Sequence, residues 1–111
     1  MDLKLNGKRV LITGASKGIG AACAKVFLEE GCHVVLVARD AQRLDEAAAA
    51  LGSPDAATTC PADLSSADER ERVAALHPGI DILVNNAGAI PAGGLLDISL
   101  ATWEADRKSV V

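Results

Sequence analysis

Three closely spaced glycines offer the clearest chemistry in this 111-residue sequence. Gly14, Gly18 and Gly20 lie in the stretch TGASKGIG, residues 13–20, between an apolar run and a helical pattern. Glycine permits a tight turn and lets backbone amides approach a ligand, and the first amides of a helix attract an anion. The stretch therefore predicts a site for the diphosphate of a dinucleotide. The alternative is a glycine-lined turn that only packs against its neighbours.

Apolar runs alternate with helical patterns around this loop, which indicates an α/β fold. The expected strands cover residues 8–13, 33–38, 56–60 and 81–85. The expected helices cover residues 18–30, 41–51 and 66–76, with Asp40 capping the second and Ser65 or Ser66 capping the third. In the first helix, the residues expected to face the sheet are Ile19, Cys23, Val26 and Phe27.

Repeated strand–helix alternation predicts right-handed crossovers and a Rossmann-like doubly wound parallel sheet. We expect about four strands in the order 3-2-1-4, with residues 1–111 forming the N-terminal part of one nucleotide-binding domain. Ligands of such sheets bind where the strand order reverses, beyond the carboxyl ends of the first and fourth strands. The loops expected to meet there are residues 14–20 and 85–88, the second of which reads NNAG.

The stretches TGASKGIG and NNAG resemble the T-G-x-x-x-G-x-G and N-N-A-G motifs of the short-chain dehydrogenase/reductase superfamily, in the same order. The resemblance extends from about Lys8 to Trp103 and includes Asp63-Leu64 after the third expected strand. It implies the nicotinamide-cofactor-binding half of an oxidoreductase. The implied cofactor-binding residues are Gly14, Ser16, Lys17, Gly18, Ile19, Gly20, Arg39, Asp63, Leu64, Asn86, Ala87 and Gly88.

The resemblance also assigns roles to residues that follow the third and fourth expected strands. Asp63 would accept a hydrogen bond from the adenine amino group, with Leu64 packing near the ring; the alternative role of Asp63 is a helix N-cap. Asn86, Ala87 and Gly88 would lie beside the adenine ribose. Asn85 would stabilise the central sheet through its side-chain amide.

The resemblance further implies a preference for NADP(H) over NAD(H). The position at which NAD-binding relatives carry a carboxylate aligns with Ala38, and Arg39 follows it. A guanidinium group suits a 2′-phosphate, and Lys17 would add a second positive charge on the same side. Asp40 stands close to the place of a ribose-binding carboxylate, but we interpret it as a helix cap. The alternative is that Lys17 and Arg39 are solvated surface charges.

The residues that carry the chemistry of this superfamily are absent from the sequence. Its members transfer hydride between the cofactor and a ketone or secondary alcohol with a Ser and a Tyr-x-x-x-Lys pair, whereas this chain has no Tyr. After Trp103, charged residues stand where the resemblance implies an apolar helix and its Asn, which favours a shifted reading frame or a premature stop near residues 104–111; the alternative is a divergent exposed helix. We therefore expect an inactive fragment whose fourth strand is an open edge. A non-catalytic NADP(H)-binding or regulatory module and an inert truncated product are the alternatives.

Composition argues against several other classes of function. An aromatic content of 2% and a net charge of −4 are unsuited to a nucleic-acid surface. His33 and His77 lack metal-ligand spacing, and the cysteines lack a C-x-x-C pair and indicate a reducing compartment. No apolar run has the length of a signal or a membrane span. We expect a cytoplasmic protein without metal or membrane partners, and the resemblance implies a homo-oligomeric parent with a small carbonyl or alcohol substrate.

Overall fold

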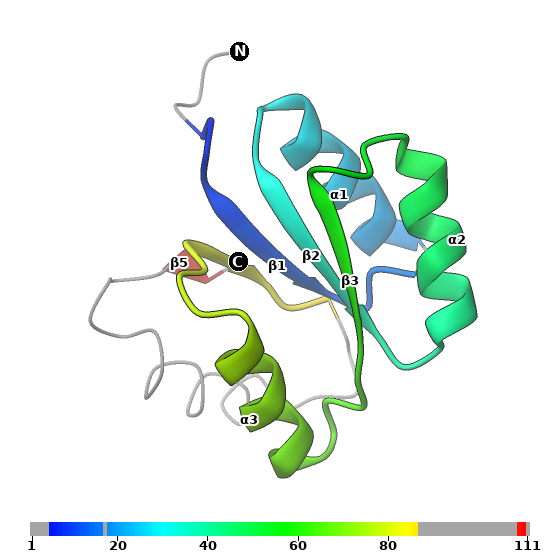
Figure 1. The fold of residues 1–111 in the computed structure, drawn as a ribbon, viewed down its shortest axis with the longest axis vertical. Coiled ribbons are helices and arrows are strands. Elements are labelled where there is room, and N and C mark those ends of the chain that lie inside the picture. Colours follow the sequence, from blue (N-terminus) through cyan, green and yellow to red (C-terminus); the bar gives the residue numbers. More distant parts are fainter. Residues whose placement is uncertain (1–4, 17, 87–108, 111) are drawn as a thin grey trace.

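A parallel sheet with helices on both of its faces forms the body of the molecule (Figure 1). The computed structural model describes residues 5–16, 18–86 and 109–110. The elements in chain order are β1 (Arg9–Thr13), α1 (Gly18–Glu29), β2 (His33–Ala38), α2 (Ala41–Leu51), β3 (Ala57–Pro61), α3 (Ala67–Leu76), β4 (Ile82–Val84) and β5 (Ser109–Val110).

The strand order is β3-β2-β1-β4-β5, and every pairing is parallel. The predicted order 3-2-1-4 is therefore confirmed. In the centre, Val10 of β1 is registered with Val34 of β2 on one side and with Ile82 of β4 on the other. The expectation of an open edge at β4 is wrong, because β5 pairs with β4 at Ile82 and Leu83.

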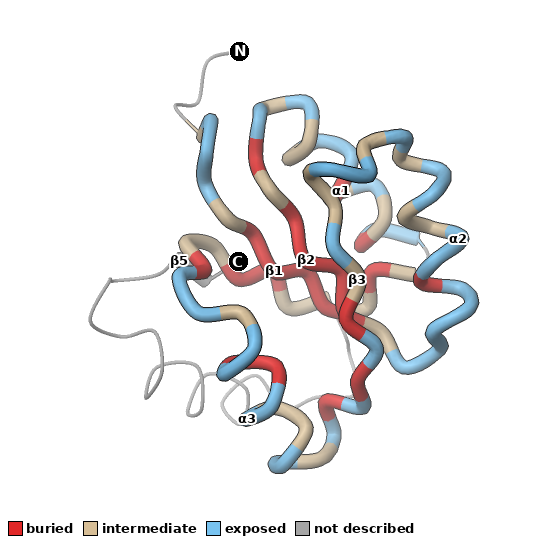
Figure 2. Tube along the Cα trace, in the orientation of Figure 1, coloured by how far each residue is buried: buried red, intermediate tan, exposed pale blue. Residues whose placement is uncertain are grey.

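The central strands are buried on both faces, as their runs of β-branched and aliphatic residues require. Alternate residues such as Leu11 and Val35 enter one core, which α3 closes with Val73. The intervening residues, among them Ile12 and Leu36, enter a second core beneath α1 and α2. Burial is accordingly concentrated in β1 and β2 (Figure 2), and these two buried strands support the loops at their carboxyl ends.

Hydrogen bonds at the other end of the β1–β4 pair fix its register. The backbone N–H of Arg9 donates to Asp81 Oδ2 at 2.9 Å, and the backbone N–H of Asp81 donates to the carbonyl oxygen of Arg9 at 2.8 Å. Asp81 immediately precedes β4. The carboxylate therefore marks the position at which β4 joins the central strand.

Side-chain caps begin α2 and α3. The carboxylate of Asp40 accepts a hydrogen bond from the backbone N–H of Arg43 at 3.1 Å, which confirms Asp40 as the N-cap of α2. Of the two serines considered for α3, Ser66 is the N-cap, and its hydroxyl accepts from the N–H of Glu69 at 3.4 Å. Gly52 ends α2 with a φ of 68°, a conformation that glycine adopts at little cost.

The residues expected on the buried face of α1 divide into two pairs. Cys23 and Phe27 are partly buried against the core, as predicted. The expectation for Ile19 and Val26 is wrong, because these side chains are 73% and 55% exposed. The buried residues of α1 are instead two small ones, Gly20 and Ala24. Gly20 lies so close to the backbone of the preceding glycine loop that a larger residue would collide with it.

Replacement of Leu36 by Ala tests this description of the core. Leu36 is completely buried in the central strand β2, so we expect Leu36→Ala to lower the free energy of unfolding by about 2–5 kcal/mol. The matched control is Leu76→Ala at a position that is 57% exposed, for which a change within about 0.5 kcal/mol is expected. Urea denaturation followed by circular dichroism measures both. Equal losses in the two variants would contradict the assignment of the core.

Candidate functional site

The hydroxyl group of Thr13 joins the carboxyl ends of β1 and β4. Thr13 ends β1 and is completely buried. Its Oγ1 accepts a hydrogen bond from the backbone N–H of Asn86 at 2.9 Å, and it lies within donating distance of Asn85 Oδ1 at 3.1 Å and the Val84 carbonyl oxygen at 3.4 Å. One side chain thus brings together the two loops predicted to meet at the reversal of strand order.

Asn86 extends this connection to the glycine loop. Its Nδ2 donates to the carbonyl oxygen of Gly14 at 3.4 Å. A Cβ atom at Gly20 would collide with that carbonyl oxygen and would stand 2.9 Å from Asn86 Nδ2, so only glycine fits there. Gly14 and Gly18 each have a φ of 63°, which favours glycine for a different reason. Each of the three glycines is therefore required by the backbone geometry of the loop.

The start of α1 has the character of an anion-binding site. The helix begins at Gly18, and its first turn contains no acidic residue. Gly18 is exposed, with open space where a side chain would stand, and Ile19 is exposed beside it. The first N–H groups of a helix have no partner within the helix, and the helix dipole favours negative charge there. This helix start therefore fits a diphosphate group. Ser16, a predicted site residue, is partly buried in the loop that precedes it.

Arg39 and Asp63 follow the neighbouring strands β2 and β3, and both are exposed. Hydrogen bonds from Ser65 hold the pKa of the Asp63 carboxyl below its usual range, and the positive charge of Arg39 makes a smaller contribution in the same direction. Asp63 is therefore an ionised hydrogen-bond acceptor near a guanidinium group. The alternative in which Asp63 caps α3 is wrong, because Ser66 occupies that position.

Other predicted site residues are placed less directly. Leu64 is only 5% exposed and lies in the core beneath α3, so its packing near an adenine ring stays a prediction. Asn85 accepts from Thr13 and therefore contributes to the sheet through its side-chain amide group, as predicted. Lys17, Ala87 and Gly88 lie outside the described residues.

Thr13 is the functional residue that the predicted set of site residues omitted. It does not contact the solvent, and its role is to hold Asn86 and Asn85 in place. The signal available in the sequence was a single hydroxyl residue between the apolar residues 10–12 and Gly14. A buried polar group needs hydrogen-bond partners, which the fourth strand supplies.

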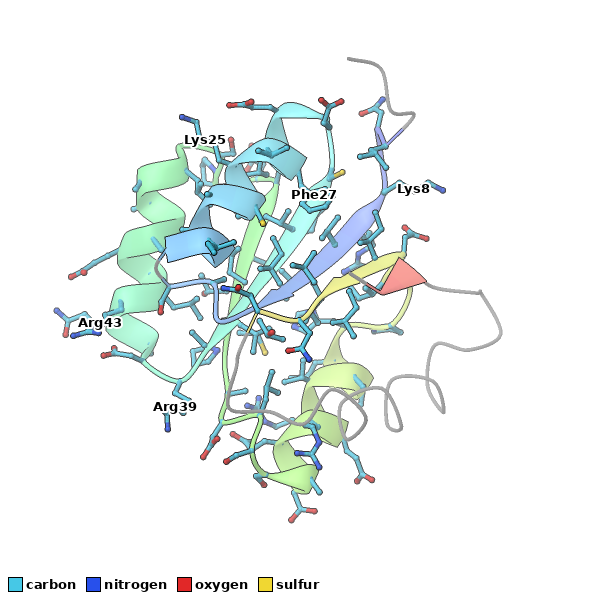
Figure 3. All side chains as sticks on the ribbon, turned by 180° about the vertical axis from the view of Figure 1, so that it is seen from behind. Lys8, Lys25, Phe27, Arg39 and Arg43 are labelled. Atoms are coloured by element: carbon cyan, nitrogen blue, oxygen red, sulfur yellow. The ribbon has the colours of Figure 1, made fainter. Side chains whose placement is uncertain are left out.

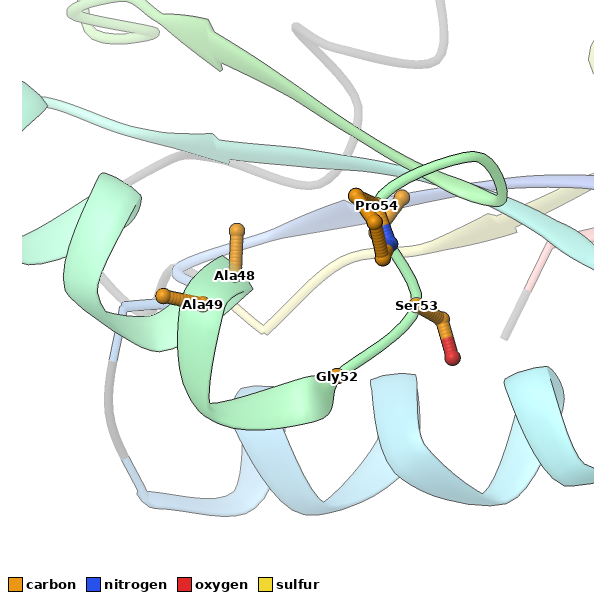
Figure 4. A pocket seen from close by; sticks show the side chains of 6 residues that line it. Ala48, Ala49, Gly52, Ser53 and Pro54 are labelled. Carbon is orange, nitrogen blue, oxygen red and sulfur yellow. The ribbon is translucent and has the colours of Figure 1, made fainter.

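A hollow of about 290 Å³ lies at the amino ends of the strands, where α2 leads into β3 (Figure 4). Ala57 begins β3, whereas the glycine loop follows the end of β1. Because the strands are parallel, the hollow and the glycine loop lie at opposite ends of the strands. Small residues line it: Ala48, Ala49, Gly52, Ser53, Pro54 and Ala57. It has no charged lining among these residues and is unsuited to a phosphate group.

Two further features are absent from the described part of the chain. It contains no helix with the length and apolar character needed to cross a lipid bilayer. It also contains no group of three or more His, Cys, Asp or Glu side chains able to hold a metal ion.

Comparison with known proteins agrees with the geometry at the ends of β1 and β4. Residues 8–106 match the family model for short chain dehydrogenases. The chain belongs to the short-chain dehydrogenase/reductase family. This family assignment confirms the resemblance seen in the two sequence motifs.

Individual relatives match most of this chain. The chain is 39% identical over 108 residues to dehydrogenase/reductase SDR family member 4 from the rabbit Oryctolagus cuniculus, a match that covers 90% of this chain and 41% of the relative. It is also 39% identical over 107 residues to the uncharacterized oxidoreductase YvrD of Bacillus subtilis, covering 93% and 40%. The chain thus spans about two fifths of the length of these relatives.

Solved structures of related enzymes superpose on the chain. The RhlG/NADP complex from Pseudomonas aeruginosa gives a TM-score of 0.73 at 35% identity, over 88% of this chain and 45% of that one. L-Sorbose reductase from Gluconobacter frateurii, complexed with NADPH and L-sorbose, gives 0.72 at 41% identity, over 79% and 36%. The chain therefore has the fold of the corresponding part of these short-chain dehydrogenase/reductase structures.

Removal of the Thr13 hydroxyl tests the connection between β1 and β4. Thr13→Val keeps the shape of the side chain but leaves the N–H of Asn86 without its acceptor, so we expect a loss of about 1–3 kcal/mol in the free energy of unfolding. The matched control is Thr59→Val, whose hydroxyl makes one exposed 3.4 Å bond to Asp45. Thermal unfolding of both variants makes the comparison. A Thr13 variant as stable as the control would show that the hydroxyl does not join the strands.

Proposed function

We propose that this chain binds NADP(H) and forms the cofactor-binding part of an oxidoreductase that transfers hydride between the cofactor and a ketone or secondary alcohol. The observation that carries the proposal is the junction of the glycine loop with Asn86 through Thr13. This junction stands at the reversal of strand order, where doubly wound sheets bind their ligands.

The diphosphate of the cofactor would lie at the first turn of α1. The open space at Gly18 admits the ligand, and the backbone amides at the start of α1 supply donors without competing acidic side chains. The side chain of Asn86 is fixed by Gly14 and therefore marks one wall of the same site. The adenine ribose would lie beside Asn86, with Ser16 in the neighbouring glycine loop.

The preference for NADP(H) rests on the residues after β2. Arg39 is exposed and extends from the loop between β2 and α2 (Figure 3), where a guanidinium group would bind the 2′-phosphate. The neighbouring carboxylate of Asp40 caps α2 and is thereby occupied by the N–H of Arg43. The two relatives solved with NADP or NADPH add support from the family.

When bound, the cofactor supplies the hydride, and the protein supplies binding and orientation. The residues of this chain would anchor the diphosphate, the adenine and the 2′-phosphate. The chain has no Tyr and therefore lacks the proton donor that the family resemblance implies. The proton transfer and the substrate pocket accordingly belong to other parts of the proposed enzyme.

Substitution of Arg39 tests the proposed cofactor. We expect Arg39→Ala to weaken NADPH binding by about tenfold or more, because a charge-assisted hydrogen bond to the 2′-phosphate is lost, and to leave NADH binding unchanged. Isothermal titration calorimetry measures both affinities. The matched control is Arg43→Ala, which removes an exposed guanidinium four residues along the chain, on α2 (Figure 3). Equal affinities for the two cofactors, unchanged in Arg39→Ala, would contradict the assignment.

A further inference from the structure

The carboxylate of Asp63 is held through only one of its two oxygen atoms. Asp63 Oδ1 accepts hydrogen bonds from the backbone N–H of Ser65 at 3.0 Å and from the hydroxyl group of Ser65 at 2.6 Å. None of the described residues donates a hydrogen bond to Oδ2. Both side chains belong to exposed residues. One oxygen is therefore saturated by the protein, and the other is available to a ligand.

The backbone of Asp63 is fixed independently of its side chain. Its N–H donates to Glu69 Oε1 at 3.4 Å. Glu69 is in turn bound by Arg72, with 2.8 Å between Arg72 Nε and Glu69 Oε2, and Arg72 also donates to the carbonyl oxygen of Pro61 at 2.9 Å. These bonds connect the end of β3 to the first turns of α3. These bonds fix the backbone of Asp63, and the hydrogen bonds from Ser65 fix the orientation of its carboxylate.

The orientation of this carboxylate determines which purine the site accepts. Adenine carries an amino group at position 6, which donates a hydrogen bond, whereas hypoxanthine and guanine carry a carbonyl oxygen there. An ionised oxygen attracts the first group and repels the second. A freely rotating carboxylate at an exposed position would select less strongly between the two groups. It could turn towards solvent, and binding would have to offset the entropy lost when it is ordered.

We propose that Ser65 is a positioning residue that fixes the Asp63 carboxylate, so that Oδ2 accepts from the 6-amino group of adenine and the site discriminates against 6-keto purines. The inference rests on the proposed function, since it concerns the adenine end of the same cofactor. It goes further in assigning base selectivity to the hydroxyl group of a residue that need not contact the ligand.

The neighbouring serine provides a matched control for a purely structural role. Ser66 caps α3 through its own hydroxyl group, and its backbone N–H donates to the carbonyl oxygen of Asp63 at 3.2 Å, but it donates nothing to the Asp63 carboxylate. Both serines therefore stabilise the start of the same helix or its preceding turn, but only Ser65 bonds the carboxylate. Ser66→Ala should lower the midpoint of thermal unfolding without changing base selectivity.

The experiment compares the binding of two cofactors by the 111-residue chain and its variants. The probes are NADPH and reduced nicotinamide hypoxanthine dinucleotide phosphate, in which a carbonyl oxygen replaces the 6-amino group. We expect the wild-type chain to bind NADPH about tenfold more tightly, as one charge-assisted hydrogen bond provides. In Ser65→Ala this ratio should fall to about threefold or less, and Ser65→Thr should restore it.

A second variant keeps the test decisive if Ser65→Ala fails to fold. Asp63→Asn retains an acceptor oxygen for Ser65 and presents an amide that can donate to a 6-keto group, so the preference for NADPH should disappear or reverse. An unchanged ratio in Ser65→Ala, or an equal fall in Ser66→Ala, would overturn the role of Ser65 while leaving the proposed function intact. Absence of saturable binding of either probe by the wild-type chain would overturn the proposed function itself.

Discussion

The hydrogen bonds of the Thr13 hydroxyl are the constraint on which the site depends. A group buried among aliphatic side chains is costly unless its hydrogen-bonding capacity is used, and Thr13 uses it on the backbone and side chain that follow β4. The two loops concerned are separated by about seventy residues in sequence, yet they are held by one side chain. The position of Asn86 relative to Gly14, and hence the shape of the proposed anion site, follows from this arrangement.

Much of the fold could be predicted because its signals are local and mutually consistent. Buried aliphatic runs specify the strands, and Asp40 and Gly52 specify the ends of α2. Alternation of strands and helices then restricts the topology to a few arrangements, of which the observed strand order is the one found in dinucleotide-binding domains. The predicted glycines proved necessary for reasons of backbone geometry that can be read for each position separately.

The parts that could not be predicted depend on contacts between distant segments. The periodicity of α1 placed Ile19 and Val26 towards the sheet, but the close approach of Gly20 to Gly14 and Asn86 turns a different face inwards. The pairing of β5 with β4 had no signal in the charged sequence around it. Which of Ser65 and Ser66 caps α3 was likewise undecided, because both have the required chemistry and only the path of the loop after Asp63 distinguishes them.

The bonds between Arg9 and Asp81 give the β1–β4 pair a second point of attachment, at the end remote from Thr13. A strand pinned at both extremities cannot slide by one residue against its neighbour without breaking both attachments. The relative position of the loops that follow β1 and β4 is therefore set by the strands, independently of the loop sequences. In the proposed cofactor site, a substitution at Arg39 would therefore change the nucleotide preference without moving the loop proposed to hold the diphosphate.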